Sequence, residues 1–210
     1  IPVYALLLDE AARQGIRNLR LLTSLKTMPA VIDWLCTHGE RPVDGFLAPG
    51  HVCAVAGAGA FRLAAERYQL PFVVSGFTGP QLVASILRLT QLRGRGTVEN
   101  LYQTVVTEEG NTEAQKLVRR YFEPCDAAWR GMGVIPGSGM RLRQAFAYAD
   151  AGSMGLDEDR TDSGCQCARV LTGAISPSEC PLFGRVCTPQ DPHGACMVSQ
   201  EGACYVSLIR

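Results

Sequence analysis

The sequence lacks long hydrophobic runs, because its longest apolar stretches, such as residues 4–8 and 52–58, fall far short of the roughly 20 residues that a membrane-spanning helix needs. It also lacks an excess of either charge, since 20 Lys and Arg balance 20 Asp and Glu. Nucleic-acid-binding proteins usually carry a basic surplus, so this balance argues against that class. With 47% hydrophobic and 19% charged residues, the chain is too apolar to be disordered over most of its length.

We expect no secretory leader from the pattern of the first residues. Asp9, Glu10 and Arg13 interrupt the first apolar stretch, and no basic segment precedes it. We therefore expect a cytoplasmic protein that binds neither membrane nor nucleic acid. Its 210 residues are enough for one sizeable domain with a small additional module.

The first 95 residues alternate between helical and extended patterns. Such alternation, with short connections rich in glycine and proline, is typical of a parallel sheet with flanking helices. We therefore expect an α/β domain over residues 1–95, Rossmann-like in the order of its elements. The predicted helices cover residues 3–14, 30–36, 61–68 and 79–92, and the predicted strands cover residues 19–22, 43–48 and 71–75.

This α/β domain begins on a predicted helix, whereas a right-handed β-α-β unit needs a strand before its helix. We therefore expect the domain to be incomplete at its N-terminus. Residues 96–150 are less regular, and we expect them to pack back on the α/β part. They contain an extended segment over 97–107, a helix over 112–122 capped by Asn111, a glycine-rich loop over 129–139 and a basic helix over 140–149.

Nine cysteines are more than an ordinary globular domain of this size carries. Cys36, Cys53 and Cys125 are scattered, and we interpret them as inert thiols. The other six crowd into the last 46 residues, at Cys165, Cys167, Cys180, Cys187, Cys196 and Cys204. The segment around them is rich in proline and glycine and has too few apolar side chains to fold without a staple. We expect residues 151–210 to form a cysteine-rich module, with the acidic residues 151–164 as its linker.

Three kinds of staple are compatible with these cysteines. An iron–sulfur cluster needs four thiolates from a loop-rich segment, and six cysteines supply four with two to spare. A structural zinc site usually carries paired Cys-x2-Cys knuckles, which this sequence lacks. Structural disulfides need an oxidising compartment, which nothing in the sequence indicates. The pattern favours the iron–sulfur cluster, and a zinc- or disulfide-stapled interaction module on an α/β body is the alternative.

Several motifs together resemble one family. Residues 179–184 (Glu-Cys-Pro-Leu-Phe-Gly), 194–199 (Gly-Ala-Cys-Met-Val-Ser) and 201–204 (Glu-Gly-Ala-Cys) resemble the C-terminal module of the HypD family, the iron–sulfur scaffold proteins of [NiFe]-hydrogenase maturation. Residues 44–52, which include the segment Pro-Gly-His-Val, and residues 129–139 are similar to further motifs of that family. These matches keep their order along essentially the whole chain.

The resemblance implies a [4Fe–4S] cluster held by a Cys-x14-Cys-x6-Cys-x16-Cys pattern, which falls here on Cys165, Cys180, Cys187 and Cys204. Cys167 and Cys196 are then left over, and the resemblance implies that they form a redox-active pair beside the cluster, as in ferredoxin–thioredoxin reductase. The spacing itself does not decide between Cys165 and Cys167 as the ligand. A structural role for the pair is the alternative, because exchange-active thiols depend on access that a sequence does not show.

His51 lies directly after a predicted strand, and ligands of parallel sheets collect at the carboxyl ends of strands. By resemblance, His51 is expected near the site where an iron carrying two cyanides and one carbon monoxide, Fe(CN)2CO, is assembled. The resemblance further implies a redox-active assembly scaffold rather than a conventional enzyme. Its expected partners are a HypC-type small chaperone, a HypE-type cyanide donor and, indirectly, the hydrogenase large subunit.

Two features depart from the family pattern. Leu25 stands where the family carries a histidine before Lys26, so any role of that histidine is absent or displaced here. The N-terminal region of the family, with a catalytic cysteine and a Gly-Pro-Gly-Cys-Pro-Val-Cys segment, does not occur in this sequence. We therefore expect an N-terminally truncated member, without the cysteine that holds iron jointly with the HypC-type chaperone.

Overall fold

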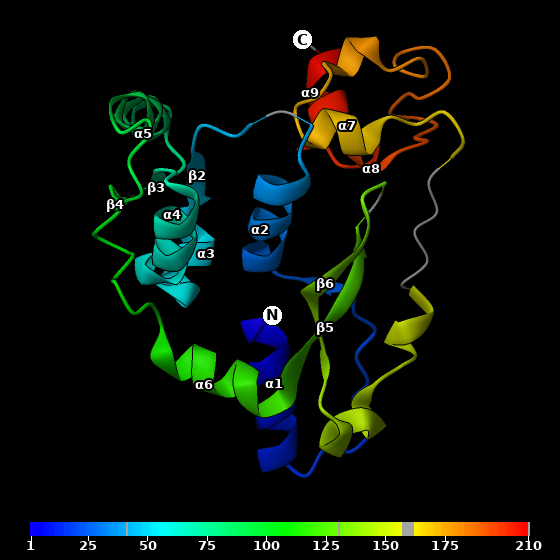
Figure 1. The fold of residues 1–210 in the computed structure, drawn as a ribbon. Helices are drawn as coiled ribbons and strands as arrows, with labels where there is room; N and C mark the ends of the chain where they lie inside the picture. Colours follow the sequence, from blue (N-terminus) through cyan, green and yellow to red (C-terminus); the bar gives the residue numbers. More distant parts are fainter. Residues whose placement is uncertain (41, 130, 157–161, 210) are drawn as a thin grey trace. The chain divides into compact units, whose positions relative to one another are not determined.

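The computed structural model describes residues 1–40, 42–129, 131–156 and 162–209, and it divides into two compact units (Figure 1). Unit 1 comprises Ile1–Leu25, Val43–Pro124 and Met140–Ala151, and unit 2 comprises Lys26–Pro42, Cys125–Gly139 and Gly152–Arg210. The predicted linker over 151–164 includes residues 157–161, which lie outside the described residues.

Unit 1 contains a parallel sheet with the strand order β2-β3-β4, formed by Phe46–Pro49, Phe72–Ser75 and Val98–Asn100. In its register, Phe46 lies opposite Phe72, which in turn lies opposite Val98. All four residues of the central strand β3 are buried, as expected for an apolar β-branched run that is covered on both faces. The predicted α/β fold with a parallel sheet is thereby confirmed.

Helices flank this sheet (Figure 1). Helices α3 (Gly50–Ala56) and α5 (Gly79–Gln91) both contact β2 and β3, and α4 (Arg62–Tyr68) follows the short 3-10 helix η1 (Ala58–Phe61). A capping box begins α5, because the side chains of Thr78 and Gln81 each accept from the backbone N–H of the other residue. The segment after β2 was not predicted as a helix, so α3 is an addition to the predicted elements.

Helices α1 (Pro2–Arg13) and α6 (Thr112–Tyr121) pack against each other in a second part of unit 1. The side chain of Asn111 caps α6 by accepting from the backbone N–H of Ala114 at 2.9 Å, which confirms the predicted cap. The buried carboxylate of Asp9 on α1 accepts from Tyr121 at 3.1 Å and also pairs with arginines of both helices. Its charge is therefore compensated inside the packing of α1 on α6.

The predicted glycine-rich loop over 129–139 and basic helix over 140–149 were wrong. This region instead contributes to a second sheet. Its strand order is β1-β6-β5, formed by Leu25–Lys26, Gly133–Leu142 and Phe122–Trp129. Glycine and proline predict a loop locally, but pairing with β5, which directly precedes this segment, and with the distant β1 overrides that preference. Only a 3-10 helix, η2 (Gln144–Ala149), remains of the predicted helix.

Two predicted extended segments are also shorter than expected. The strand expected over 19–22 is a single bridge between Leu21 and Asp150, and the segment expected over 97–107 is a strand only in β4. In β4 the chain stops pairing with β3 at Asn100, where the Asn100 side chain donates to the carbonyl of Val106 at 2.7 Å. This bond closes the following residues into a turn.

Unit 2 consists of short elements around a small core. Its helices are α2 (Met28–His38), η3 (Ser153–Leu156), α7 (Cys167–Leu171), η4 (Pro177–Glu179), α8 (Ala195–Val198) and α9 (Ala203–Leu208). Five of the six buried members of this core carry sulfur, namely four cysteines and Met197. Across the described ranges of the whole chain, every helix is too short or too polar to cross a membrane.

Candidate metal centre

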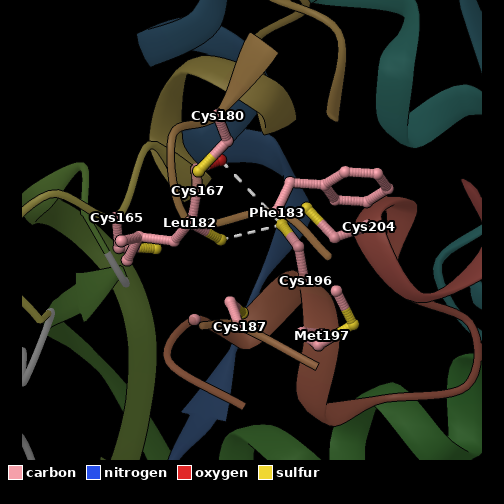
Figure 2. Close-up of a pocket in the computed structure, with 10 residues that line it drawn as sticks. Cys165, Cys167, Cys180, Leu182, Phe183, Cys187, Cys196, Met197 and Cys204 are labelled. Atoms are coloured by element: carbon pink, nitrogen blue, oxygen red, sulfur yellow. Dashed lines mark hydrogen bonds between the residues drawn. The ribbon is translucent and has the colours of Figure 1, made fainter. Parts of the chain in front are cut away.

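All six clustered cysteines line one pocket of unit 2 (Figure 2). Cys165 and Cys167 lie at the start of α7, Cys180 and Cys187 lie in the loop between α7 and α8, Cys196 lies on α8, and Cys204 lies on α9. The other lining residues are Leu182, Phe183, Gly194 and Met197, so none of the described residues that line the pocket carries a charged side chain. The pocket therefore presents several sulfur atoms in apolar surroundings.

Local hydrogen bonds fix the two loop cysteines. The short helix η4 begins with a capping box, in which Glu179 accepts from the backbone N–H of Ser176 at 2.7 Å, and Cys180 follows it directly. The backbone N–H of Cys187 then donates to the carbonyl of Leu182 at 2.9 Å. The six residues between the two cysteines thus form a closed loop that places both sulfur atoms at the pocket.

Cys165 is held against the backbone of Gly194, the residue that precedes α8. A Cβ atom built on Gly194 would lie 2.5 Å from the Cys165 sulfur, a distance that no side chain tolerates. Glycine is therefore needed here for the close approach of the two segments. Gly202, before α9, approaches the carbonyl of Cys196 in the same way.

The sulfur atoms of Cys167 and Cys196 lie 2.8 Å apart, and both side chains are buried. The Cys196 sulfur also lies 3.9 Å from the carbonyl oxygen of Cys167 (dashed lines in Figure 2). Hydrogen bonding to Cys167, followed by burial, raises the pKa of Cys196 well above its usual value. The structure therefore brings together the two cysteines that were predicted as a pair.

Electrostatic interactions connect the other four cysteines through the pocket. Burial raises the pKa of Cys204 to about 11, and negative charge at Cys167, Cys180 and Cys187 adds to this rise. Burial likewise raises the pKa of Cys165, against a lowering by the backbone N–H of Cys167, and Cys180 and Cys187 again contribute. Cys165 and Cys204 therefore both lie within electrostatic range of the two loop cysteines.

This donor set is compatible with an iron–sulfur cluster, which needs four thiolates from a loop-rich segment. Four thiolates in this apolar pocket would repel one another, since no Lys or Arg among the described lining residues would offset their charge. Bound metal cations would supply the missing positive charge and keep the thiols deprotonated. Within the described residues, no three or more Cys, His, Asp or Glu side chains converge as they would on a single metal ion.

His51 lies in unit 1 and so does not belong to this pocket. It is the second residue of α3, directly after the carboxyl end of β2, and its exposed ring lies 5.3 Å from the ring of Phe77, which follows β3. Gly50 before it is tightly enclosed, since a Cβ there would lie 2.7 Å from the carbonyl oxygen of Ser75. The His51 ring therefore stands at the end of the sheet where parallel strands usually bind their ligands.

The remaining cysteines lie outside the pocket lining. Cys53 is fully buried in unit 1, and burial raises its pKa to about 11. Cys36 is half-buried on α2, where burial and the charge of Asp33 raise its pKa. Raised pKa values keep both thiols protonated, which agrees with their interpretation as inert.

One residue at the pocket was missed by the sequence analysis. The backbone N–H of His193 donates to the sulfur of Cys187 at 3.3 Å, and its imidazole Nδ1 lies 2.5 Å from a carboxylate oxygen of Asp162. The signal that could have identified it is the position of this histidine directly before Gly194, among the clustered cysteines.

These features define an α/β protein that carries a cysteine-lined pocket in a separate loop-rich unit. The chain belongs to the HypD family, whose model, described as "Hydrogenase formation hypA family", matches residues 1–208.

Curated relatives agree with this assignment. The chain is 40% identical over 97% of its length to a hydrogenase maturation factor HypD2 of Bradyrhizobium diazoefficiens, and 37% identical over 97% to a hydrogenase expression/formation protein HupD of Azotobacter chroococcum. It is 35% identical over 92% to a putative hydrogenase expression/formation protein of Methanocaldococcus jannaschii. These alignments cover 57%, 56% and 55% of the relatives, so the chain spans little more than half of their length.

Proposed function

We propose that this chain is the cluster-binding part of a hydrogenase maturation scaffold. In this proposal Cys165, Cys180, Cys187 and Cys204 hold a [4Fe–4S] cluster, and Cys167 and Cys196 form a redox-active pair beside it. The observation that carries the proposal is that all six cysteines line one pocket. Membership of the HypD family supports the link to hydrogenase maturation.

The geometry favours Cys165 over Cys167 as the fourth ligand. The sulfur of Cys167 lies 2.8 Å from that of Cys196, the other member of the proposed pair, and Cys165 lines the same pocket as both loop cysteines. The bound cluster would supply one-electron transfer, and its potential would depend on burial and on hydrogen bonds to the ligand sulfurs. The protein supplies the four thiolates, the apolar walls and a backbone N–H to Cys187.

The pair of Cys167 and Cys196 is placed to form and break a disulfide. Closing their contact from 2.8 Å to a bond of about 2.05 Å needs a side-chain shift of less than about 1 Å. Forming that bond oxidises two thiols and releases two protons and two electrons, and the proposed cluster would accept these electrons one at a time and pass them to the assembly of the Fe(CN)2CO group. In this proposal, the pair and the cluster would together supply electrons from residues 165–204.

In the same proposal, the α/β part in unit 1 serves the assembly of an Fe(CN)2CO group as substrate, with His51 near that site. A HypC-type chaperone and a HypE-type cyanide donor are the proposed partners, and the hydrogenase large subunit is the final recipient. The supporting observation is the position of His51 at the carboxyl ends of β2 and β3.

Anaerobic reconstitution with iron and sulfide tests the cluster. We expect a brown protein with broad absorption near about 400 nm and about four irons and four sulfides per chain. Replacing Cys180, Cys187 or Cys204 by alanine should abolish this absorption. Cys196→Ala is the matched control, because it removes a lining sulfur that is not a proposed ligand and should retain the iron.

The alternative is a structural module stapled by zinc or disulfides. A colourless protein that holds one zinc per chain, or one with no iron and sulfide after reconstitution, would overturn the cluster. Loss of iron in Cys196→Ala would instead overturn the division between ligands and redox pair.

A further inference from the structure

His193 lies at the edge of the cysteine pocket, and the proposed function does not use it. It follows Pro192 and precedes Gly194, so it ends the loop that begins at Cys187. Within this loop, the backbones of Thr188 and Asp191 exchange two hydrogen bonds of 3.1 and 3.2 Å. The loop is therefore closed on itself before the chain reaches His193.

The backbone of His193 contacts a proposed cluster ligand directly. Its N–H donates to the sulfur of Cys187 at 3.3 Å, across the six-residue separation of the loop. A hydrogen bond to a ligand sulfur stabilises negative charge there, and such bonds help to set the reduction potentials of iron–sulfur clusters. The orientation of this one peptide group therefore affects the chemistry of the site.

The side chain of His193 holds that peptide group in place. Nδ1 lies 2.5 Å from Oδ2 of Asp162, and since an ionised carboxylate only accepts, Nδ1 is the donor. Nε2 is buried, lies 3.6 Å from a carboxylate oxygen of Asp191, and makes no hydrogen bond to any described residue. The imidazole is thus fixed by Asp162, a residue 31 positions earlier in the sequence.

We propose that His193 is a positioning residue of the cluster site. Its bond to Asp162 fixes the loop, so that the His193 N–H stays directed at the Cys187 sulfur and raises the reduction potential of the bound cluster. The reduced cluster carries one more negative charge, so it gains more from this N–H than the oxidised cluster does. This inference rests on the cluster of the proposed function.

The first test measures the reduction potential of the reconstituted chain. His193→Ala should disfavour reduction by about tenfold in the equilibrium constant, which is a fall of about 59 mV for a one-electron couple. His193→Asn keeps a side-chain nitrogen near the Nδ1 position and should restore most of the potential, whereas Asp162→Ala should reproduce the fall. The matched control is His38→Ala, an exposed histidine on α2 of the same unit. An unchanged potential in His193→Ala overturns the proposal.

The second test does not depend on the reduction potential. In the reconstituted chain under anaerobic conditions, amide hydrogen exchange of residues 188–194 is followed by mass spectrometry. His193→Ala and Asp162→Ala should speed this exchange by about fivefold or more, with the peptides that contain β3 unchanged, because the loop opens more often. Equal exchange rates in variant and parent would refute the positioning role. A parent chain that takes up no iron would refute the proposed function instead, and the same exchange measurement on the purified chain would then still decide on His193.

Discussion

The buried cores of the two units differ in the side chains that form them. In unit 1, the aromatic rings of Phe46 and Phe61 stack on Phe72 at 4.7 and 5.5 Å, and the central strand beneath them is wholly buried. In unit 2, four of the six buried core side chains are cysteines, and the pKa values of two of them, Cys196 and Cys204, are raised. The comparison indicates that apolar burial stabilises unit 1, whereas in the proposed function a bound metal would be the main stabilising contribution in unit 2.

Removal of the metal should have the largest effect, because it should destabilise unit 2 and leave unit 1 unchanged. After chelation of iron from the reconstituted chain, peptides from residues 165–209 should exchange amide hydrogens at least about 100-fold faster, because their main staple is gone. Peptides that contain β3 should change by less than about twofold, since their core is apolar. Hydrogen exchange followed by mass spectrometry measures both. Retained protection in residues 165–209 would contradict the dependence of unit 2 on metal.

Truncation of the aromatic core should have the next largest effect. Phe72 is fully buried, so Phe72→Ala should lower the free energy of unfolding of unit 1 by about 3–5 kcal/mol. The control is Phe77→Ala, which removes the same side chain where it is 59% exposed and should cost less than about 1 kcal/mol. Denaturant unfolding compares the two. Similar costs for both would show that β3 is not the centre of the core.

A single added methyl group at the cysteine pocket should have a smaller effect, on both stability and iron content. Gly194→Ala would place a methyl group 2.5 Å from the Cys165 sulfur, so we expect a destabilisation of about 1–3 kcal/mol and a lower iron content after reconstitution. Gly79→Ala, at the start of α5 in unit 1, is the control, because its new methyl group would meet no atom within 4 Å. Iron analysis and thermal unfolding check both. Full iron content in Gly194→Ala would argue against a tightly packed ligand at Cys165.

The smallest expected effect concerns pH and Cys53 in unit 1. Burial raises its pKa from about 9 to about 11, so the folded protein binds this proton more tightly than the unfolded chain does. Its contribution to stability is therefore complete below about pH 9 and is lost as the pH rises toward 11, by about 1 kcal/mol at pH 10. Unfolding of metal-free parent and Cys53→Ala between pH 8 and about 11 measures the difference in slope. Parallel pH profiles would contradict a protonated, buried thiol at this position.

The sequence predicted the elements whose signals are local. The alternating pattern identified β2, β3 and α5, and a single capping residue, Asn111, identified the start of α6. Sequence spacing also indicated that six cysteines belong to one module. Each of these signals acts over a few residues or through residue type alone.

The parts that were missed depend on distant partners. Strand β6 is rich in glycine, and only its pairing with β1 and β5 makes it a strand. The bond between His193 and Asp162 joins positions 31 residues apart, whereas the pairing of Cys167 with Cys196, 29 residues apart, was expected only from the family resemblance. Such contacts arise from tertiary packing, which residue patterns do not encode directly.

Cys167 touches both proposed sets of cysteines, since its N–H reaches the sulfur of Cys165 and its own sulfur touches Cys196. In the proposed function, purification in air would leave this pair as a disulfide, whereas purification under a reductant would leave two thiols. Oxidation of Cys167 would therefore also affect Cys165, the proposed iron ligand two residues earlier. In this proposal, the presence or absence of air during purification would therefore determine which form of the chain is obtained.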